Sequence, residues 1–411
     1  MAVRRIRLCS LAIALAWFPL AGQENLAQIQ KKALELKARG DAAGSLAEWE
    51  RAAAIDPKSA RIQDEIGFLL EVLQRHEEAM IHLRKAVELD PRLATAQYHL
   101  GVAYWLRSDP DRSISCLRAA VELEPRNFDY RFHLGHAFIG TSQYADALAQ
   151  FVAATGINPK HAEAWNQLGL ALQHTGDASG AIDAYRRAVT LDSSDLDARN
   201  NLGFMLVSTG RADEGIAEFR RILAIDPSSN MARLNIGFAH LQKAELTSAE
   251  REFREVLRRD PNLAIAHYDL AVALKQKDDL EGAKTELARA LRLDAGMSEA
   301  HYTLGIICWQ SGDFDEAARE MQAAISLRPD YGEAHFMLGT ALKQKGDLDG
   351  AESALRTAIR LQPNDPGPYN TLGQVLRQKG DAEGSRKAFA AGAAAKEKKE
   401  VELGRMLQKK Q

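Results

Sequence analysis

The sequence contains little of what usually constrains a fold or marks a chemical function. Its 411 residues include only 3 cysteines and 12 prolines, and aromatic residues make up 7% of the chain. So few cysteines exclude a disulfide framework, and Cys116 and Cys308 also lie far apart along the chain. The formal net charge of −3 gives no support to nucleic-acid binding, because that function uses a concentrated basic surface.

Motifs for catalysis and metal binding are also missing. The chain has no Walker loop, no Gly-x-Gly-x-x-Gly, no Gly-x-Ser-x-Gly and no paired-cysteine metal motif. His76-Glu77 begins like a zinc-protease motif, but Met80 stands where the second histidine belongs. The sequence therefore predicts no catalytic residue, no cofactor and no metal site, and we expect a protein that is not an enzyme.

The start of the chain, residues 1–22, differs from the rest. Arg4, Arg5 and Arg7 form a positive start, residues 8–20 are mostly apolar, and small residues follow. This pattern is typical of a secretory signal peptide, and the apolar run is short for a membrane span. We expect residues 1–22 to be a signal peptide and the protein to be exported. The lack of a disulfide framework favours a bacterial periplasm. The alternative is an uncleaved segment that anchors the protein to the inner membrane.

The strongest signal is a repeat with a period of 34 along the chain. Glycines recur at this spacing or its multiple at Gly67, Gly101, Gly135, Gly169, Gly203, Gly237, Gly305, Gly339 and Gly373. The two in-phase gaps hold Ala33 and Ala271. A glycine in the middle of a helix costs about 1 kcal/mol relative to alanine, so we expect each unit to need a close approach of two helices. These nine residues are called the repeat glycines below.

Other residues keep the same phase and divide each unit into two helices. A small residue follows the repeat glycine by twelve positions and a large apolar one by sixteen, as in Ala147 and Phe151. The first helix is expected to end at Gly40, Gly176, Gly210, Gly312, Gly346 and Gly380. Aspartate N-caps of the second helix are expected at Asp41, Asp109, Asp177, Asp279, Asp313, Asp347 and Asp381. Proline closes most units, because it cannot continue a helix.

This pattern resembles the tetratricopeptide repeat. Repeat five carries its motif in Trp165, Leu168, Gly169, Ala181, Tyr185 and Ala188, with Ser193 in place of the closing proline. The resemblance covers residues 26–399 and implies an all-α, right-handed superhelical solenoid of eleven helix-turn-helix units. These units start at residues 26, 60, 94, 128, 162, 196, 230, 264, 298, 332 and 366. Residues 400–411 are expected to complete a capping helix, in which Val401, Met406 and Leu407 cover the last apolar face.

In similar proteins, positions 2, 5, 6, 9, 12 and 13 of each first helix line a concave groove, and we call them the groove positions. Repeats five to seven present amides there: Asn166, Gln167, Asn200, Asn201 and Asn235. This row resembles the asparagine ladder in the repeat region of O-linked GlcNAc transferases, whose catalytic domain has no counterpart in the sequence. Because an amide both donates and accepts hydrogen bonds, such a row can hold an extended peptide backbone.

Repeats eight to eleven present aromatic and cationic groups instead: Tyr268, Lys275, Tyr302, Trp309, Phe336, Lys343 and Arg377. This combination suits a peptide with acidic and apolar residues, although some rings are expected only to fill space between first helices. His267, His301 and His335 are spaced by 34, as are His99 and His133. Two such histidines could span a metal, but we interpret the first set as packing aromatics with one edge in water.

These patterns predict a non-enzymatic scaffold that binds extended peptides or a partner protein in its groove. No nucleic-acid partner is expected, membrane contact is expected only through an uncleaved leader, and self-association is compatible with such an array. Two alternatives are open. One is a subunit of an envelope transferase or processing complex, and the other is an envelope protein that binds a metal or another ligand.

Overall fold

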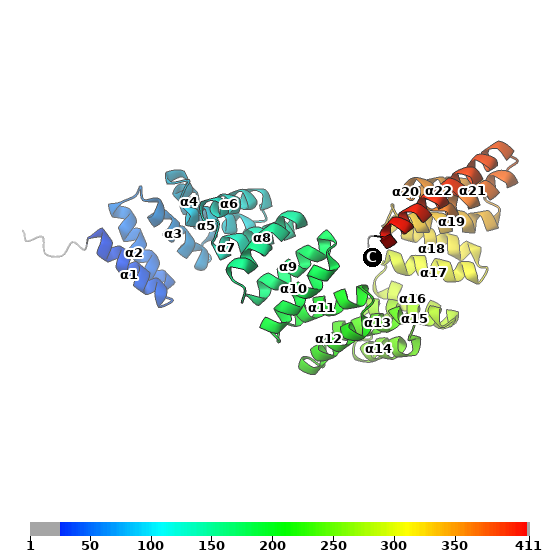
Figure 1. The fold of residues 1–411 in the computed structure, drawn as a ribbon, viewed down its shortest axis with the longest axis horizontal. Coiled ribbons are helices and arrows are strands. Elements are labelled where there is room, and N and C mark those ends of the chain that lie inside the picture. The colour runs from blue at the N-terminus through cyan, green and yellow to red at the C-terminus, as the bar shows by residue number, and fades with distance from the viewer. Residues whose placement is uncertain (1–24, 409–411) are drawn as a thin grey trace, which may run out of the picture. The chain divides into compact units, whose positions relative to one another are not determined.

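The computed structural model describes residues 25–408, and these contain 22 α-helices and no strand (Figure 1). The predicted all-α class of paired helices is therefore confirmed. The predicted signal peptide, residues 1–22, lies outside the described residues. The chain divides into two units, with unit 1 ending at Leu191 and unit 2 beginning at Asp192.

Odd-numbered helices are the first helices of the repeats, and even-numbered helices are the second. Unit 1 contains α1 (Leu26–Ala38), α2 (Ala42–Ile55), α3 (Ala60–Val72), α4 (His76–Leu89), α5 (Ala94–Leu106), α6 (Pro110–Leu123), α7 (Phe128–Gly140), α8 (Tyr144–Ile157), α9 (Ala162–Thr175) and α10 (Ala178–Leu191). Unit 2 contains α11 (Leu196–Ser208), α12 (Ala212–Ile225), α13 (Asn230–Gln242), α14 (Leu246–Arg259), α15 (Ala264–Gln276), α16 (Leu280–Leu293), α17 (Ser298–Gln310), α18 (Phe314–Leu327), α19 (Gly332–Lys345), α20 (Leu348–Leu361), α21 (Pro366–Gln378) and α22 (Ala382–Gln408).

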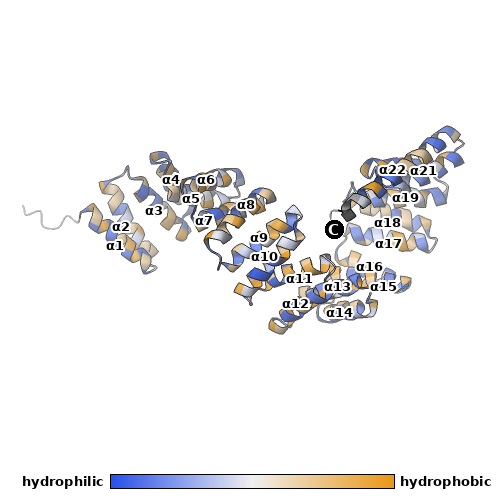
Figure 2. Ribbon diagram, in the orientation of Figure 1, coloured by the Kyte–Doolittle hydropathy of each residue, from blue (hydrophilic) through white to orange (hydrophobic). Residues whose placement is uncertain are grey.

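Within each unit, every helix packs against the next helix along the chain. From α3 onward, each first helix also contacts the first helix of the following repeat in the same unit. Figure 2 shows hydrophobic and hydrophilic stretches on the labelled helices, as expected for elements that are buried on one side only. A repeat therefore buries its apolar faces by stacking on its neighbours. None of the helices in residues 25–408 is long and apolar enough to cross a membrane.

The repeat glycines lie at the contact between the two helices of a repeat. A Cβ atom on Gly203 would lie 2.6 Å from Phe219 Cε1, and one on Gly169 would lie 2.7 Å from Tyr185 Cδ1. In all nine repeats, the first atom met belongs to the large apolar residue sixteen positions later. This is the close helix approach that the periodic glycines predict, and it leaves room for hydrogen only.

Replacing Gly203 by leucine should force α11 and α12 apart. We expect Gly203→Leu to lower the free energy of unfolding by about 1–3 kcal/mol or more through overpacking, as measured by urea denaturation. Gly156→Leu is the control, because a Cβ atom on the exposed Gly156 of α8 meets nothing within 4 Å. The control should leave stability unchanged or raise it by up to about 1 kcal/mol. Equal losses in both variants would contradict this account of the glycines.

The turn between the two helices of a repeat has the same backbone conformation throughout residues 25–408. At the six glycines predicted to end first helices, φ lies between +80° and +89°. The other five repeats place a different residue there, with φ between 57° and 65°: Gln74, Ser108, Ser142, Ala244 and Asp278. A left-handed conformation costs a non-glycine residue roughly 1–2 kcal/mol. The packing of the helix pair therefore imposes this turn even where the sequence opposes it.

Glycine at such a position should relieve the strain. Ala244→Gly is expected to raise the free energy of unfolding by roughly 0.5–1 kcal/mol, because the gain in the turn exceeds the added chain entropy of the unfolded state. The same substitution at Ala217, which is exposed within α12, should lower it by about 1 kcal/mol. Urea denaturation of both variants measures the difference. A loss of stability in Ala244→Gly would show that the turn is not strained.

Aspartates cap the second helices where the sequence predicts them. Asp177 Oδ1 accepts a hydrogen bond from the Gly180 N–H at 2.9 Å, and Asp381 Oδ1 accepts one from the Gly384 N–H at 2.7 Å. The same bond caps five further helices, at Asp41, Asp109, Asp279, Asp313 and Asp347. These caps satisfy N–H groups that lack a partner within the helix.

The last helix, α22, continues well past the end of the array. Lys398 and Lys399 are exposed, as expected for a solvated cap. Val401 is also exposed and does not cover the final apolar face. The reason is that α22 has 27 residues against 13 in α21, which is its only helix partner among the described residues. The side chains of Met406 and Leu407 lie outside the described part of the structure.

Candidate peptide-binding surfaces

In eight of the eleven repeats, the side chain at position 4 of the first helix forms a hydrogen bond that fixes the helix to the loop before it. In repeat five, Trp165 Nε1 donates to the carbonyl of Pro159 at 3.0 Å. The same bond to the carbonyl six residues earlier recurs for Gln63, Gln97, Arg131, Arg199, His267, His335 and Tyr369. The residue types differ so widely that the sequence pattern did not predict this shared role.

His267, His301 and His335 occupy position 4, and two of them, His267 and His335, make this loop bond. His267 is buried, with Nδ1 2.6 Å from Glu286 Oε2 and Nε2 2.9 Å from the carbonyl of Pro261. His301 Nδ1 lies 2.6 Å from Glu320 Oε2. The interpretation as packing aromatics is therefore incomplete, because these rings are hydrogen-bonded links within the repeat. Among residues 25–408, no group of three or more His, Cys, Asp or Glu side chains is placed to hold a metal ion.

The predicted row of amides divides between the two units. Asn166 and Gln167 are half-buried on α9 of unit 1. In unit 2, Asn200 and Asn201 lie on α11 and Asn235 lies on α13. Asn235 Nδ2 donates to Asn200 Oδ1 at 2.7 Å, so the structure brings these two amides together. This bond does not use the Asn200 amide N–H or the Asn235 side-chain oxygen, so both can bond a ligand.

Large apolar side chains are exposed on the same first helices. Phe204 and Phe238, at groove position 9 of α11 and α13, are 43% and 39% exposed. Met231 and Ile265, at position 2 of α13 and α15, are 61% and 41% exposed. Four exposed apolar side chains at groove positions are typical of an interaction surface. We call them, with Asn200 and Asn235, the amide patch.

Asp269 continues the polar row at position 6 of α15, and it was not predicted. It is in phase with Asn201 and Asn235, so the repeat register alone would have identified it. Burial raises the pKa of its carboxyl to about 7. When protonated, a carboxyl donates and accepts hydrogen bonds as an amide does. Asp269 therefore extends the amide row by one repeat.

The aromatic and cationic residues predicted in repeats eight to eleven are partly engaged with their neighbours. Tyr302 packs on Tyr331, with ring centroids 4.8 Å apart, and Arg328 lies over the Tyr331 ring. Lys343 Nζ donates to Gln374 Oε1. The remaining members are the half-buried Tyr268, Lys275, Trp309 and Phe336 and the exposed Arg377. Tyr268, Trp309 and Phe336 pack against apolar clusters that extend over their own and neighbouring repeats. Much of this aromatic surface thus serves packing.

Unit 1 contains two adjoining cavities that were not predicted. Cavity A, of about 420 Å³, is lined at groove positions by Val102, Trp105, Phe132, His133, His136 and Glu163. Cavity B, of about 130 Å³, shares Val102 and is lined by Phe68, Glu71, Val72, Tyr98, His99 and Leu106. The groove positions were considered only in repeats five to eleven of the sequence. The same positions in repeats two to four would have identified both cavities.

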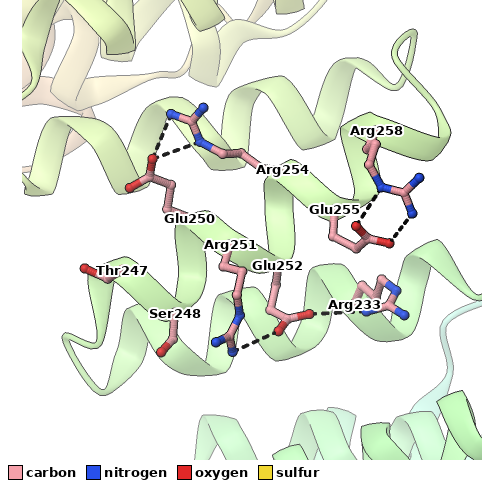
Figure 3. Close-up of a pocket in the computed structure, with 9 residues that line it drawn as sticks. All are labelled: Arg233, Thr247, Ser248, Glu250, Arg251, Glu252, Arg254, Glu255 and Arg258. Carbon is pink, nitrogen blue, oxygen red and sulfur yellow. Dashed lines mark hydrogen bonds and ion pairs between the residues drawn. The ribbon is translucent and has the colours of Figure 1, made fainter.

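A third hollow, of about 730 Å³, runs along α14 in unit 2 and is lined by charged side chains (Figure 3). Arg254 pairs with Glu250 at 2.7 Å, and Arg258 pairs with Glu255 at 2.8 Å. Figure 3 also shows Glu252 between Arg251 and Arg233, at 3.3 and 3.5 Å. Because these groups neutralise one another, we interpret the hollow as a paired, solvated face rather than a ligand site.

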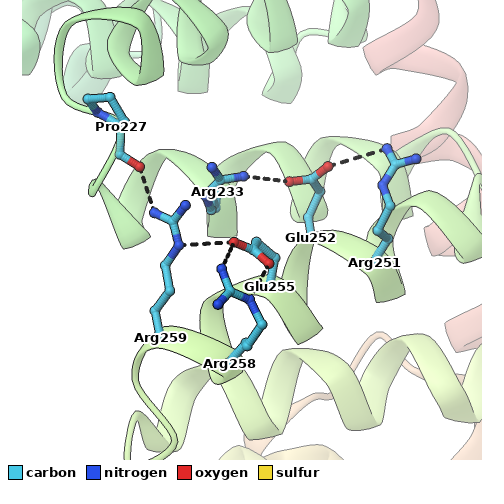
Figure 4. Close-up of polar contacts among 7 residues, drawn as sticks. All are labelled: Pro227, Arg233, Arg251, Glu252, Glu255, Arg258 and Arg259. Atoms are coloured by element: carbon cyan, nitrogen blue, oxygen red, sulfur yellow. Dashed lines mark hydrogen bonds and ion pairs between the residues drawn. The ribbon is translucent and has the colours of Figure 1, made fainter.

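The same face fixes the position of the preceding loop. Figure 4 shows Arg259 donating to the carbonyl of Pro227 at 2.6 Å, while its Nε lies 3.0 Å from Glu255. Hydrogen bonds from Arg258, supported by Arg259, lower the pKa of Glu255 to about 2. Arg233 occupies position 4 of this repeat but turns to Glu252. Arg259 therefore supplies the loop bond that position 4 supplies in other repeats.

Comparison with known families identifies the same repeats. Tetratricopeptide repeat profiles match residues 134–196, 176–230, 234–300, 268–318 and 302–366, and further profiles match 73–107 and 94–127. The first profile alone covers more than half of the chain. The chain belongs to the tetratricopeptide repeat family. A search of curated protein sequences found no match to it.

Solved structures show the same fold. A tetratricopeptide repeat protein from Parabacteroides merdae has a TM-score of 0.55 at 15% identity, with 61% of this chain and 98% of that one covered. Yeast Tom70 has a TM-score of 0.50 at 13% identity, with 94% of this chain and 98% of that one covered. At these identities the likeness concerns the fold alone.

The raised pKa of the half-buried Asp269 carboxyl should make stability depend on pH. Its folded-state pKa of about 7 lies above the unfolded value of about 3.9. Its contribution to stability is therefore largest below pH 4 and is lost as the pH rises to 7. We expect Asp269→Asn to be more stable than the parent by roughly 1–3 kcal/mol at pH 8 and about equal at pH 4, by urea denaturation. The exposed Asp197→Asn is the control, and an equal trend in both variants would contradict the role of burial.

Proposed function

We propose that this protein is a non-enzymatic scaffold that binds extended peptides or the surface of a partner protein through its groove positions. The tetratricopeptide repeat fold supports a protein-interaction role, and the profile matches extend over most of the array. The proposal concerns each unit separately, because each presents its own set of unengaged side chains at these positions.

The amide patch is the observation that carries the proposal. Asn200 and Asn235 offer a donor and an acceptor to a peptide backbone, as described above. Phe204 and Phe238 offer exposed rings on the same two helices. A polar pair for the main chain beside apolar contacts for side chains is the combination that peptide recognition needs. The Asn200–Asn235 pair also resembles the asparagine ladder of O-linked GlcNAc transferases.

The regular spacing of the helices supports a role without catalysis. First helices start at one constant spacing from Leu26 to Pro366, so no repeat holds an inserted loop that could carry a reactive group. The ring nitrogens of His267 bond Glu286 and the Pro261 carbonyl, which weakens the alternative of a metal-binding protein. We propose no cofactor.

The cellular setting is proposed from the sequence of the leader. Its positive start and short apolar run favour export, and the small number of cysteines favours a bacterial periplasm. Within the cell envelope, an array of this kind is suited to assembling other proteins or to recruiting an exported enzyme.

The test compares partner capture by two double variants of the full chain. Phe204→Ser with Phe238→Ser removes the apolar part of the amide patch. Ile225→Ser with Leu293→Ser removes similarly exposed apolar side chains at the ends of second helices. We expect crosslinked partners from the cell envelope to be reduced at least about tenfold in the first variant, because apolar anchors dominate such interfaces. The second variant should keep them.

Thermal unfolding followed by circular dichroism shows that both variants fold. Equal capture by the parent and the first variant would move the interaction away from the amide patch. Loss in both variants, or capture of no protein at all, would contradict a scaffold that acts through its groove positions.

A further inference from the structure

Cavities A and B of unit 1 adjoin at Val102 along three first helices, and together they are called the recess. Val102 of α5 lines both of them, cavity B continues to Phe68 of α3, and cavity A continues to Phe132 of α7. At about 420 Å³, cavity A lies within the range of roughly 300–1,000 Å³ that is usual for ligand sites. The recess therefore has room for more than one side chain of a bound segment.

The walls of the recess are fixed before any ligand binds. Phe132 packs edge-on against His136, with ring centroids 4.5 Å apart, and Tyr98 packs on Tyr130 at 4.8 Å. The Trp105 indole lies over Gly140, where a Cβ atom would come within 2.3 Å of Cη2. Aromatic rings held by one another lose little freedom on binding, so such a site is pre-organised.

The floor and rim of the recess expose apolar surface that the fold itself does not cover. Leu106 is 63% exposed and Val72 is 54% exposed, and both line cavity B. Trp105 is also exposed at the edge of cavity A. These residues lie at groove positions 12 and 13, and they suit aliphatic side chains of a ligand.

Two carboxylates, those of Glu71 and Glu163, line the recess, and no lysine or arginine does. Lys37 Nζ lies 4.2 Å from the centroid of the Phe68 ring of cavity B and also pairs with Glu65. Glu71 is engaged by Arg107 at 3.0 Å and by His76 at 2.6 Å. Glu163 has only His136, at 3.7 Å, and burial lowers the pKa of that imidazole and so favours its neutral form. The exposed Glu163 carboxylate at the rim of cavity A is therefore left without a cationic partner.

A second carboxylate stands beside the recess. Asp129 is exposed on the first turn of α7, at groove position 2, as Glu163 is on α9. The backbone carbonyl of Asp129 lies 2.8 Å from Nδ1 of His133, which lines cavity A. Asp129 and Glu163 thus place two negative charges in the same register of successive repeats, beside an apolar recess.

Building on the proposed function, we propose that this recess binds a cationic, apolar peptide segment. Large aliphatic side chains of the segment occupy cavities A and B, and lysine or arginine side chains pair with Asp129 and Glu163. Charge complementarity selects this occupant over an acidic segment, which would meet unpaired carboxylates at the rim. The ligand is thus opposite in charge to the one that the cationic residues of repeats eight to eleven would suit.

Selection of random dodecapeptides displayed on phage, with the folded full chain as the target, tests the proposal. We expect the selected peptides to combine two or more large aliphatic residues with a net positive charge. Their affinity is then measured by fluorescence anisotropy with the labelled synthetic peptide. The double variant Asp129→Lys, Glu163→Lys should weaken binding at least about tenfold and, on reselection, should favour acidic peptides. Glu122→Lys, an exposed change on α6, is the control and should change neither.

A second variant tests the apolar part. Leu106→Ser should weaken binding of the same peptide about tenfold, because it removes an exposed contact of cavity B without touching the core. Circular dichroism verifies the fold of each variant.

The outcomes separate this proposal from the proposed function. Selection of acidic peptides would overturn the proposal of a cationic ligand and leave the scaffold function standing. The same conclusion would follow if peptide binding were unchanged in both unit 1 variants but lost in the double variant Phe204→Ser, Phe238→Ser. Self-association of the parent that Leu106→Ser abolishes would show a second copy as the occupant and would also overturn the proposal of a cationic ligand. Selection of no peptide would count against both proposals.

Discussion

The contact between a repeat glycine and the large side chain sixteen positions later determines the rest of this structure. It brings the two helices of a repeat so close that one of them can carry no side chain at that point. The ring or branched chain that fills the space is buried, as Phe151, Tyr185, Phe219 and Phe253 show. Because the same contact recurs from repeat to repeat, the geometry of one repeat is passed on to the next, and each first helix presents the same positions on the same face.

Hydrogen bonds supply the second constraint. In eight of the eleven repeats, the position 4 side chain holds the first helix to the loop that precedes it, whether the donor is an indole, an amide, a guanidinium, an imidazole or a phenol. The accepting carbonyl lies at the same place in each loop, six residues before position 4, and many different side chains can donate to it. Where Arg233 turns away, Arg259 from the second helix replaces it. The requirement therefore belongs to the backbone, and the residue that meets it is free to vary.

This difference explains what the sequence could predict. The glycine contact requires one residue type, so its period of 34 is visible in the sequence. That period predicted the all-α class, the helix pairs and the aspartate caps. The position 4 bonds and the five non-glycine turns were missed because unlike residues meet a single geometric demand. Asp269 and the recess around Val102 were within reach of the register rule. They were missed because they do not resemble a known ligand-binding ladder, and because exposure and charge pairing are visible only in three dimensions.

The local character of the contacts has a consequence for how the array assembles and opens. Every helix in a unit touches only helices one or two steps away along the chain. Such a chain has low contact order, so its repeats can form quickly and in any order, each needing only a folded neighbour. Opening is local for the same reason, and its free energy differs from repeat to repeat. A ligand that spans several first helices would link repeats that otherwise open independently, so it would add cooperativity to a structure that has little of its own.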